Sequence, residues 1–237
     1  MIDALSHFFR GPLEEIGESL SVTPDPDAIN LADFLTNGAL EEALAALSRR
    51  WERPDPRATA TQWSKFYFSR LLPPALLPAI LAGWQLPLSP ETLSIRLDHE
   101  GIVTGFVLKH AGAANADAPR FHFLLDGHLA PVISALSEES GLPAKVLWSN
   151  AANILEATLT RASALLGADH AGIAEGIALL NAAKRPDGRA NPVYDPIRYR
   201  KTAAGTERIR RLCCLRYFTD ELTLCKSCPR KQEHRAR

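Results

Sequence analysis

All four cysteines of this chain of 237 residues lie within sixteen residues near its C-terminal end. Cys213 and Cys214 are adjacent, ten residues follow, and Cys225 and Cys228 form a Cys-x-x-Cys pair. Four thiolates are the donors of a tetrahedral zinc site or of an iron–sulfur cluster. The pattern therefore predicts a scaffold of roughly 200 residues followed by one metal centre, with all four cysteines as its ligands.

The N-terminal residues do not resemble a secretory leader, because acidic and basic side chains interrupt residues 1–21. We therefore expect a cytoplasmic location, where thiols stay reduced. In that compartment a dense cysteine cluster indicates a metal site rather than two disulfides. The overall composition, with 46% hydrophobic and 23% charged residues, is ordinary for a globular protein.

Charge is distributed unevenly along a chain whose formal net charge is zero. Residues 1–183 contain 12 Lys and Arg against 21 Asp and Glu, a balance of −9, and residues 184–237 contain 15 against 6, a balance of +9. The cysteines lie in the basic part, and a positive surface there can attract an acidic protein or an anionic ligand. The alternative is a solvated basic face that only offsets the charge of the thiolates and of the acidic remainder.

The hydrophobic periodicity predicts an α+β fold that is mainly helical. Helices are expected where apolar residues recur every three or four positions, at about residues 37–51, 60–72, 148–166 and 169–180. Alternating patterns predict three strands, at residues 93–98, 102–110 and 121–126. These strands would form a small antiparallel sheet over about residues 93–126, and a cysteine-rich segment that binds the metal follows at the C-terminal end.

The same patterns divide the chain into three regions. Residues 1–60 form an N-terminal helical region, residues 61–205 an α+β core, and residues 206–237 the cysteine-rich segment, although the three can also form one continuous domain. Thr206 is expected to cap a short helix that leads into the cysteines.

The longest charge-free stretch runs from Leu71 to Pro90 and contains five prolines. These prolines argue against one membrane-spanning helix, and Pro73 and Pro74 are expected to end the helix that begins near residue 60. Two interpretations remain for the stretch. It is either a broken segment packed on the core, or an apolar surface for a ligand or for peripheral contact with the inner membrane.

The spacing of the cysteines also bears on which metal they bind. Four-thiolate zinc sites usually combine two Cys-x2–4-Cys knuckles that face one ion, and adjacent cysteines fit that arrangement poorly because neighbouring side chains diverge. A 2Fe–2S cluster is wider, and each of its two irons takes two thiolates, so it accepts ligands that point apart. Spacing favours the 2Fe–2S cluster and leaves open zinc, a site with three ligands, or no metal.

The run from Arg211 to Pro229, with Cys-Cys-x10-Cys-x2-Cys at its centre, resembles the C-terminal signature of the FhuF family of ferric-siderophore reductases. Three shorter passages are similar to that family in order and spacing, namely Gln62-Trp63-Ser64-Lys65, Trp148-Ser149-Asn150 and Asn191-Pro192. The resemblance covers about residues 55–230, and its specific part is the cysteine run.

The resemblance implies a 2Fe–2S cluster on Cys213, Cys214, Cys225 and Cys228, which transfers one electron to the Fe(III) of a siderophore, with the hydroxamate type expected. It also implies an external electron donor such as a ferredoxin or a flavin reductase. The chain has no dinucleotide-binding fingerprint, which agrees with an external donor.

Four further residues are candidates for binding the substrate: Trp148, Asn150, Arg210 and Arg211. Arg210 and Arg211 belong to the arginines that crowd the approach to Cys213. Trp148 lies on an apolar stripe, so packing in the core is its alternative role. Asn150 can either bind a ligand or cap a loop.

Two other functions compete with this interpretation. A zinc-stabilised binding module would use the basic segment to contact nucleic acid or a protein, but the chain lacks the interleaved aromatic and basic residues of nucleic-acid surfaces, so no nucleic acid is expected. A siderophore synthetase would need a longer chain and a phosphate-binding loop, and it would have no use for the cysteines.

Overall fold

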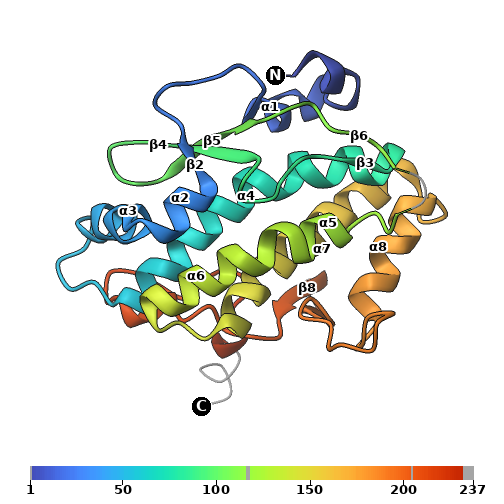
Figure 1. Ribbon diagram of the computed structural model, residues 1–237. Helices are drawn as coiled ribbons and strands as arrows, with labels where there is room; N and C mark the ends of the chain where they lie inside the picture. Colours follow the sequence, from blue (N-terminus) through green and yellow to red (C-terminus); the bar gives the residue numbers. More distant parts are fainter. Residues whose placement is uncertain (1, 116–117, 204, 232–237) are drawn as a thin grey trace.

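The computed structural model describes residues 2–115, 118–203 and 205–231. Among them are the α-helices α1 (Glu14–Gly17), α2 (Leu31–Thr36), α3 (Ala39–Ser48), α4 (Pro56–Ala82), α5 (His122–Leu124), α6 (Ala130–Ser140), α7 (Ala144–Leu166) and α8 (Ala171–Asn181). The strands are β1 (Leu20–Ser21), β2 (Ile29–Asn30), β3 (Trp84–Gln85), β4 (Leu93–Leu97), β5 (Val103–Leu108), β6 (Ala113–Ala114), β7 (Ile197–Thr202) and β8 (Gly205–Arg210). Short 3-10 helices are η1 (Asp3–Phe8), η2 (Gly11–Leu13), η4 (Arg216–Phe218) and η5 (Pro229–Lys231), and η3 (Leu125–Leu129) is a π-helix. Figure 1 shows this arrangement, which confirms an α+β fold that is mainly helical.

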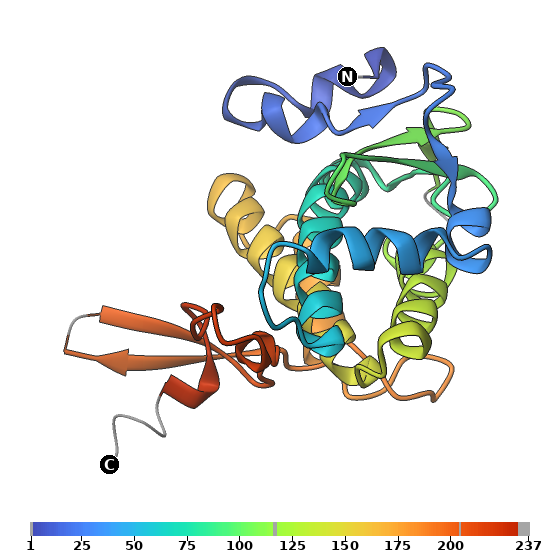
Figure 2. The same cartoon turned by 90° about the vertical axis from the view of Figure 1, so that its left-hand side faces the viewer.

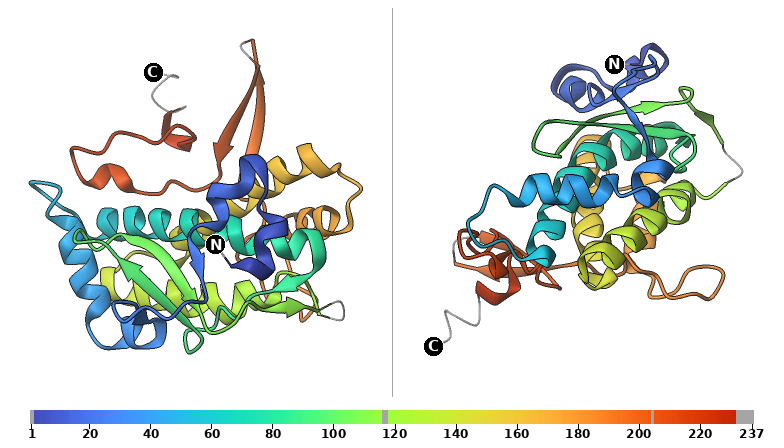
Figure 3. Two further views of the ribbon diagram at one scale, coloured as in Figure 1. Left: turned by 90° about the horizontal axis from the view of Figure 1, so that it is seen from above. Right: turned by 60° about the vertical axis from the view of Figure 1, so that its left-hand side comes forward.

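Helix α4 is the centre of the fold. It begins where the Asp55 carboxylate accepts hydrogen bonds from the backbone N–H groups of Arg57 and Ala58, and it ends at Gly83, whose φ of 62° is left-handed. Most of its residues are buried, and α3, α6, α7 and α8 pack around it (Figures 1 and 3). A helix buried on most sides shows no strong amphipathic period, because apolar residues face every direction.

The prediction that Pro73 and Pro74 end this helix is wrong. Helix α4 continues through both residues and through Pro78 to Ala82. Proline lacks a backbone N–H, so Pro74 leaves the Arg70 carbonyl without its helical donor. The Ser19 hydroxyl donates a hydrogen bond of 3.0 Å to that carbonyl instead. Burial of the neighbouring apolar side chains in the core offsets the remaining cost.

The stretch from Leu71 to Pro90 packs mostly on the core, as the first of its two interpretations stated. It is not broken at its first three prolines, because α4 continues to Ala82. Leu71, Leu72 and Ile80 are fully buried, so they offer no surface to a membrane. None of the helices in the described part of the chain is both long enough and apolar enough to cross a membrane.

A small sheet lies between the N-terminal helices and α4, as Figures 1 and 2 show. Its strand order is β1-β5-β4-β2, with β4 antiparallel to β5 and to β2, and β1 parallel to β5. Strands β3 and β6 form a separate antiparallel pair. The predicted strands at 93–98 and 102–110 therefore exist as an antiparallel pair.

The third predicted strand, at residues 121–126, is wrong. These residues form α5 and the start of the π-helix η3. The buried positions Phe121, Leu124, Leu125 and Leu129 recur every three or four residues rather than every second one. Phe121 and Phe123 flank a polar residue and so suggest the period of two of a strand. The stretch is too short for this pattern to distinguish a strand from a helix.

Strands β7 and β8 form an antiparallel hairpin that projects from the body, as Figure 2 shows. Thr206 pairs with Lys201 in this hairpin, so the predicted helix from Thr206 is also wrong. The hairpin crosses the predicted boundary between residues 205 and 206, and α4 crosses the one between residues 60 and 61. The division into three regions stays a prediction, and residues 232–237 of its last region lie outside the described part.

His128 and Tyr67 form a polar pair inside the core. The Leu88 carbonyl can only accept a hydrogen bond, so the Nδ1–H of His128 donates to it over 2.7 Å. The Nε2 atom then accepts from the Tyr67 hydroxyl over 3.0 Å. Both residues are fully buried, and the neutral imidazole satisfies its two partners without placing a charge in the core.

We expect His128 to make the stability of the fold depend on pH. Burial lowers the pKa of His128 from 6.5 to about 4. Between these pH values the unfolded chain binds a proton that the folded chain excludes. The free energy of unfolding is therefore unaffected by protonation of His128 above pH 6.5. It falls as the pH drops towards 4, by up to about 3 kcal/mol. Urea unfolding between about pH 7 and pH 5 should show this decline, and His128→Gln should flatten it. An equally steep decline in the variant would contradict the prediction.

The close approach of α8 to α4 gives a second prediction. A Cβ atom at Gly172 would lie 2.2 Å from the Ile80 carbonyl oxygen. Gly172→Ala must therefore move one helix, and we expect it to lower the free energy of unfolding by about 1–3 kcal/mol. Gly127→Ala adds the same methyl group where no atom lies within 4 Å, and should be neutral or slightly stabilising. Urea unfolding compares the two variants, and equal effects would show that the contact does not limit the packing.

Candidate metal centre

The segment that follows β8 lies against the N-terminal part of α4. The Arg210 backbone N–H donates to the Ser227 carbonyl over 2.9 Å, and this bond ties the Cys-x-x-Cys turn to β8. Thr219 is fully buried, and its hydroxyl accepts a hydrogen bond of 3.2 Å from the Asp55 N–H at the cap of α4. The Arg57 guanidinium lies 4.4 Å from the centre of the Phe218 ring. These contacts hold the cysteine segment against the start of the central helix.

The four thiols form one chain of contacts. The sulfur atoms of Cys213 and Cys228 are 3.7 Å apart. Cys214 also lies near Cys213 and Cys225, close enough for these thiols to shift one another's pKa. Two thiolates on one tetrahedral ion, each about 2.3 Å from it, lie about 3.8 Å apart. The Cys213–Cys228 pair already has this separation.

Two of these thiols are buried and two are nearer the surface. Cys214 and Cys228 are buried, whereas Cys213 and Cys225 are partly exposed. Hydrogen bonds from the Cys213 and Cys225 thiols, together with the charge of Lys65, lower the pKa of Cys214. Sharing of a proton with Cys214, together with burial, raises the pKa of Cys213. The neighbouring thiols and Lys65 therefore favour the thiolate form of Cys214.

The backbone is strained beside the adjacent pair of cysteines. Leu215 has a φ of 59°, in the left-handed region that residues other than glycine rarely adopt. In this conformation its N–H donates a hydrogen bond to the Cys213 sulfur. Strain of this kind collects at functional sites, where surrounding contacts hold it in place. The turn at Leu215 thus places the two neighbouring thiols in one cluster.

Lys65 of α4 contacts the cysteines directly. Its Nζ atom donates to the Cys214 sulfur over 3.0 Å and to the Gln62 side-chain oxygen over 2.9 Å. Burial lowers the pKa of Lys65, and the negative charge of Cys214 opposes that effect. The lysine is thus a partly buried cation whose closest charged partner is a thiolate.

Arg210 of β8 is a second cation beside the cysteines. It is only 3% exposed, and its Nη2 atom donates to the Ser149 hydroxyl over 3.0 Å and to the Asn150 side-chain oxygen over 2.6 Å. Its Nε atom is buried and has no hydrogen-bond partner among the described residues. Burial lowers the pKa of Arg210, and the charges of the four thiols oppose that effect.

No carboxylate of the described residues forms an ion pair with Lys65 or Arg210. A cation that is removed from water needs a nearby negative charge, and the cysteine thiolates supply it for Lys65 and Arg210. A four-thiolate cluster of iron and sulfide, or a zinc ion with four thiolates, carries that charge. The chemistry of these residues, four thiols beside two cations, therefore suits an anionic thiolate-bound metal group. Their geometry is incomplete for one: within the described ranges, no set of three or more His, Cys, Asp or Glu side chains, the cysteines included, is arranged to hold a metal ion.

The four residues predicted to bind substrate occupy different surroundings. Trp148 is partly buried and packs against the core, and Arg211 is half-exposed and pairs with Asp195 over 2.6 Å. Asn150 is buried, and its side-chain nitrogen donates to the hydroxyls of Thr61 and Ser64. The structure thus brings Asn150 and Arg210 together beside the cysteines, inside the protein rather than on a basic face. A role in binding substrate stays a prediction for all four.

The sequence patterns did not indicate a role for Lys65, although it belongs to the passage Gln62-Trp63-Ser64-Lys65 that is similar to the FhuF family. A signal was available, because Lys65 is one of few charged residues in a helix that is otherwise largely apolar. Asn191, of the third short passage, lies elsewhere: its side-chain nitrogen donates to the carbonyls of Leu179 and Ala182 and so closes the end of α8. That passage supports the fold rather than the cysteine cluster.

The base of the β7–β8 hairpin is fastened to α7 by a second polar group. The Arg208 guanidinium contacts the Glu156 carboxylate and donates to the Asn153 side-chain oxygen over 2.8 Å. The Tyr199 hydroxyl also donates to Glu156. Arg208 is therefore paired, and its charge is not available to the cysteines.

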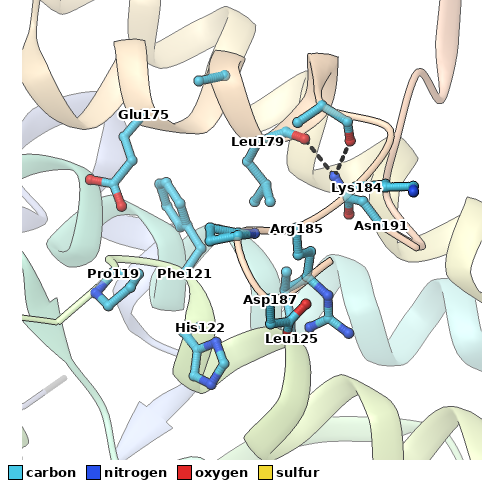
Figure 4. Close-up of a pocket in the computed structure, with 13 residues that line it drawn as sticks. Pro119, Phe121, His122, Leu125, Glu175, Leu179, Lys184, Arg185, Asp187 and Asn191 are labelled. Carbon is cyan, nitrogen blue, oxygen red and sulfur yellow. Dashed lines mark hydrogen bonds between the residues drawn. The ribbon is translucent and has the colours of Figure 1, made fainter. Parts of the chain in front are cut away.

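A cavity of about 600 Å³ lies away from the cysteines, among α5, α8 and the loop after α8 (Figure 4). One of its residues, Glu175, pairs with Arg120, whose guanidinium reaches the Ala79 carbonyl near the end of α4. Lys65 and Ala79 are separated by roughly 20 Å along the helix. The cavity contains none of the predicted site residues.

Asn150 offers a test of the polar contacts behind the cysteines. Asn150→Ala removes the acceptor of the buried Arg210 and the donor to Thr61 and Ser64. We expect a loss of about 2–4 kcal/mol in the free energy of unfolding, because buried polar groups lose their partners. Asn181→Ala, at an exposed position at the end of α8, should change it by less than about 0.5 kcal/mol. If urea unfolding gave equal values for both, the Asn150 contacts would contribute nothing to stability.

Comparison with known proteins places this geometry in a family. The family described as "Ferric iron reductase FhuF-like transporter" matches residues 61–207. A relative named "Ferric siderophore reductase", from Escherichia coli (strain K12), is 26% identical over 217 residues, which cover 86% of this chain and 80% of the relative. The matched range includes Lys65, Asn150 and the β7–β8 hairpin up to residue 207 and stops before the cysteines. Because the match covers more than half of its length, the chain belongs to the FhuF family.

Proposed function

We propose that this protein is a 2Fe–2S ferric-siderophore reductase, which transfers one electron to siderophore-bound Fe(III) in the cytoplasm and so releases Fe(II). Membership of the FhuF family and the name of the relative support reduction of ferric siderophores. The observation that carries the proposal is the cluster of four cysteines beside two cations that have no carboxylate partner in the described residues.

The chemistry of siderophores explains why one electron is enough. Siderophores hold Fe(III) with hard, anionic oxygen donors, and these donors bind the less charged Fe(II) far more weakly. Reduction therefore loosens the metal without breaking a bond in the siderophore. We propose hydroxamate-type siderophores as the substrates, as the family resemblance implies.

Contacts between the thiols in pairs support the proposal of a two-iron centre. A bound 2Fe–2S cluster would supply a one-electron donor, and each iron takes two thiolates. Cys213 and Cys228 form one pair in contact, and Cys214 and Cys225 form the other. Each pair combines a buried thiol with a partly exposed one, so a cluster held there has one side towards the solvent.

The chain's other residues would position and insulate this centre. Lys65 and Arg210 offset the charge of the thiolates from the protein side. The electron must then pass through the side where Cys213 and Cys225 are exposed, both from the donor and to the ferric complex. The donor is proposed to be a separate protein, a ferredoxin or a flavin reductase. A peripheral position at the inner membrane is compatible with this proposal but needs a surface other than the buried Leu71–Ile80 segment.

A zinc-stabilised binding module is the second candidate, because the 3.7 Å between the sulfurs of Cys213 and Cys228 also suits one zinc ion. Anaerobic purification followed by metal analysis and visible absorption, before and after dithionite, separates the two. We expect two irons per chain and a red-brown absorption that bleaches on reduction. One zinc per chain and no colour would overturn the reductase and leave the binding module.

Substitution of the ligands tests the assignment of the cysteines. Cys228→Ser removes a buried thiol of one pair, and Cys225→Ser a partly exposed thiol of the other. Both should lose the visible absorption of the cluster and the reduction of ferric hydroxamates, because each leaves one iron with a single thiolate. Far-UV circular dichroism should keep most of the helical signal, since the core helices lie outside the cysteine segment. Normal absorption and turnover in either variant would remove that residue from the ligand set.

A further inference from the structure

We propose that Lys65 and Arg210 set the reduction potential of the metal centre, by stabilising the extra negative charge that the cluster gains when it accepts an electron. This inference rests on the proposed function, because it concerns a cluster that changes its charge. It assigns to Lys65 a role as a positioning and tuning residue that neither the resemblance nor the relative's name describes.

Lys65 lies where it can act directly on a ligand of the cluster. Its Nζ atom donates a hydrogen bond of 3.0 Å to the Cys214 sulfur, so both its charge and its N–H group point at a ligand. Hydrogen bonds to cluster sulfurs and nearby positive charge both favour the reduced state. Because the side chain is partly buried, solvent screens this interaction less than it would at the surface.

Both cations are held in place by hydrogen bonds to neighbouring side chains. Gln62, one turn earlier in α4, accepts the second hydrogen bond of Lys65. Ser149 and Asn150 of α7 accept from Arg210, and Asn150 is itself fixed by hydrogen bonds to Thr61 and Ser64 of α4. The cations therefore stay near the cysteines and need no rearrangement when the charge of the cluster changes.

Three other arginines of the β7–β8 hairpin and its end are already paired with carboxylates. Arg208 binds Glu156, Arg211 binds Asp195, and Arg200 binds Glu207. Their charges are largely offset before any cluster is considered. Lys65 and Arg210 have no such carboxylate partner among the described residues, so their charge acts on the cysteines.

The consequence follows from the charge of the cluster. A 2Fe–2S cluster with four thiolates is dianionic when oxidised and trianionic when reduced. Two cations beside it nearly neutralise the oxidised form and leave the reduced form with one excess negative charge. Removal of one cation raises the energy of the reduced form more than that of the oxidised form, because the interaction grows with the charge of the cluster. The reduction potential should then become more negative.

The test compares the wild type with Lys65→Met, which keeps the length of the side chain without its charge or N–H groups, and with Lys65→Arg, which keeps both. Lys201→Met removes one charge from the exposed end of the β7–β8 hairpin and serves as the control. Reduction is followed by visible absorption during anaerobic potentiometric titration, with no siderophore present. We expect the equilibrium constant for one-electron reduction to fall at least tenfold in Lys65→Met, a shift of about 59 mV to more negative potential. Lys65→Arg and Lys201→Met should change it less than threefold.

Other outcomes have a defined meaning. An iron-loaded Lys65→Met protein with the wild-type potential overturns this inference and leaves the proposed function intact. A wild-type protein that contains zinc and no iron overturns both. Loss of the cluster from Lys65→Met with retention in Lys65→Arg supports the need for the charge, and loss from both contradicts it. Arg210→Gln should shift the potential in the same direction as Lys65→Met, and an unchanged potential in its iron-loaded form removes Arg210 from the proposal.

Discussion

The hydrogen bond between Arg210 and Asn150 joins parts of the chain that meet at the cysteines. Arg210 belongs to the strand that leads into the cysteine segment, and Asn150 belongs to α7. Asn150 in turn donates to Thr61 and Ser64 on α4. One buried amide therefore fixes the position of the last strand relative to the two longest helices. The thiols and Lys65 can lie within contact distance because these elements are held in register.

Burial and charge act in opposite directions at this site, and their balance determines what it can bind. Desolvation lowers the pKa of both Lys65 and Arg210, so each cation is costly where it stands. The thiolates lower that cost, and the cations make the thiolates easier to form. The two kinds of group stabilise each other, which explains why a basic strand and an apolar helix place their charged residues at the same point.

The cysteine cluster, the helical character and the central pair of antiparallel strands could be predicted from the sequence because each rests on a strong local pattern. The course of α4 could not, since proline at positions 73, 74 and 78 is unfavourable in an isolated helix, and only the contact from Ser19 and the surrounding core make it acceptable. Residues 121–126 and the strand that contains Thr206 were misassigned for a similar reason. Their short patterns fit two structures, and tertiary packing decided between them.

The candidate site was likewise only partly predictable from the sequence. Spacing identified the four cysteines, but the positions of Lys65 and Arg210 depend on how distant segments meet. Arg210 was expected among exposed basic residues because charge along a sequence says nothing about which side chain turns inward. The strand pairing of β8 with β7 turns Arg210 towards α7, whereas Arg211, the next residue, faces Asp195.

The order in which the elements appear along the chain has a consequence for how the protein is made. The buried apolar residues of the core run from Ile2 to Val193, so all of them are synthesised before the first cysteine. A domain can fold as a unit while the rest of the chain is still being synthesised. The cysteines therefore emerge from the ribosome next to a core that can already be folded, with Lys65 in place on its surface. The proposed metal group would then be inserted in the last step of maturation, in which a short segment closes over a completed scaffold.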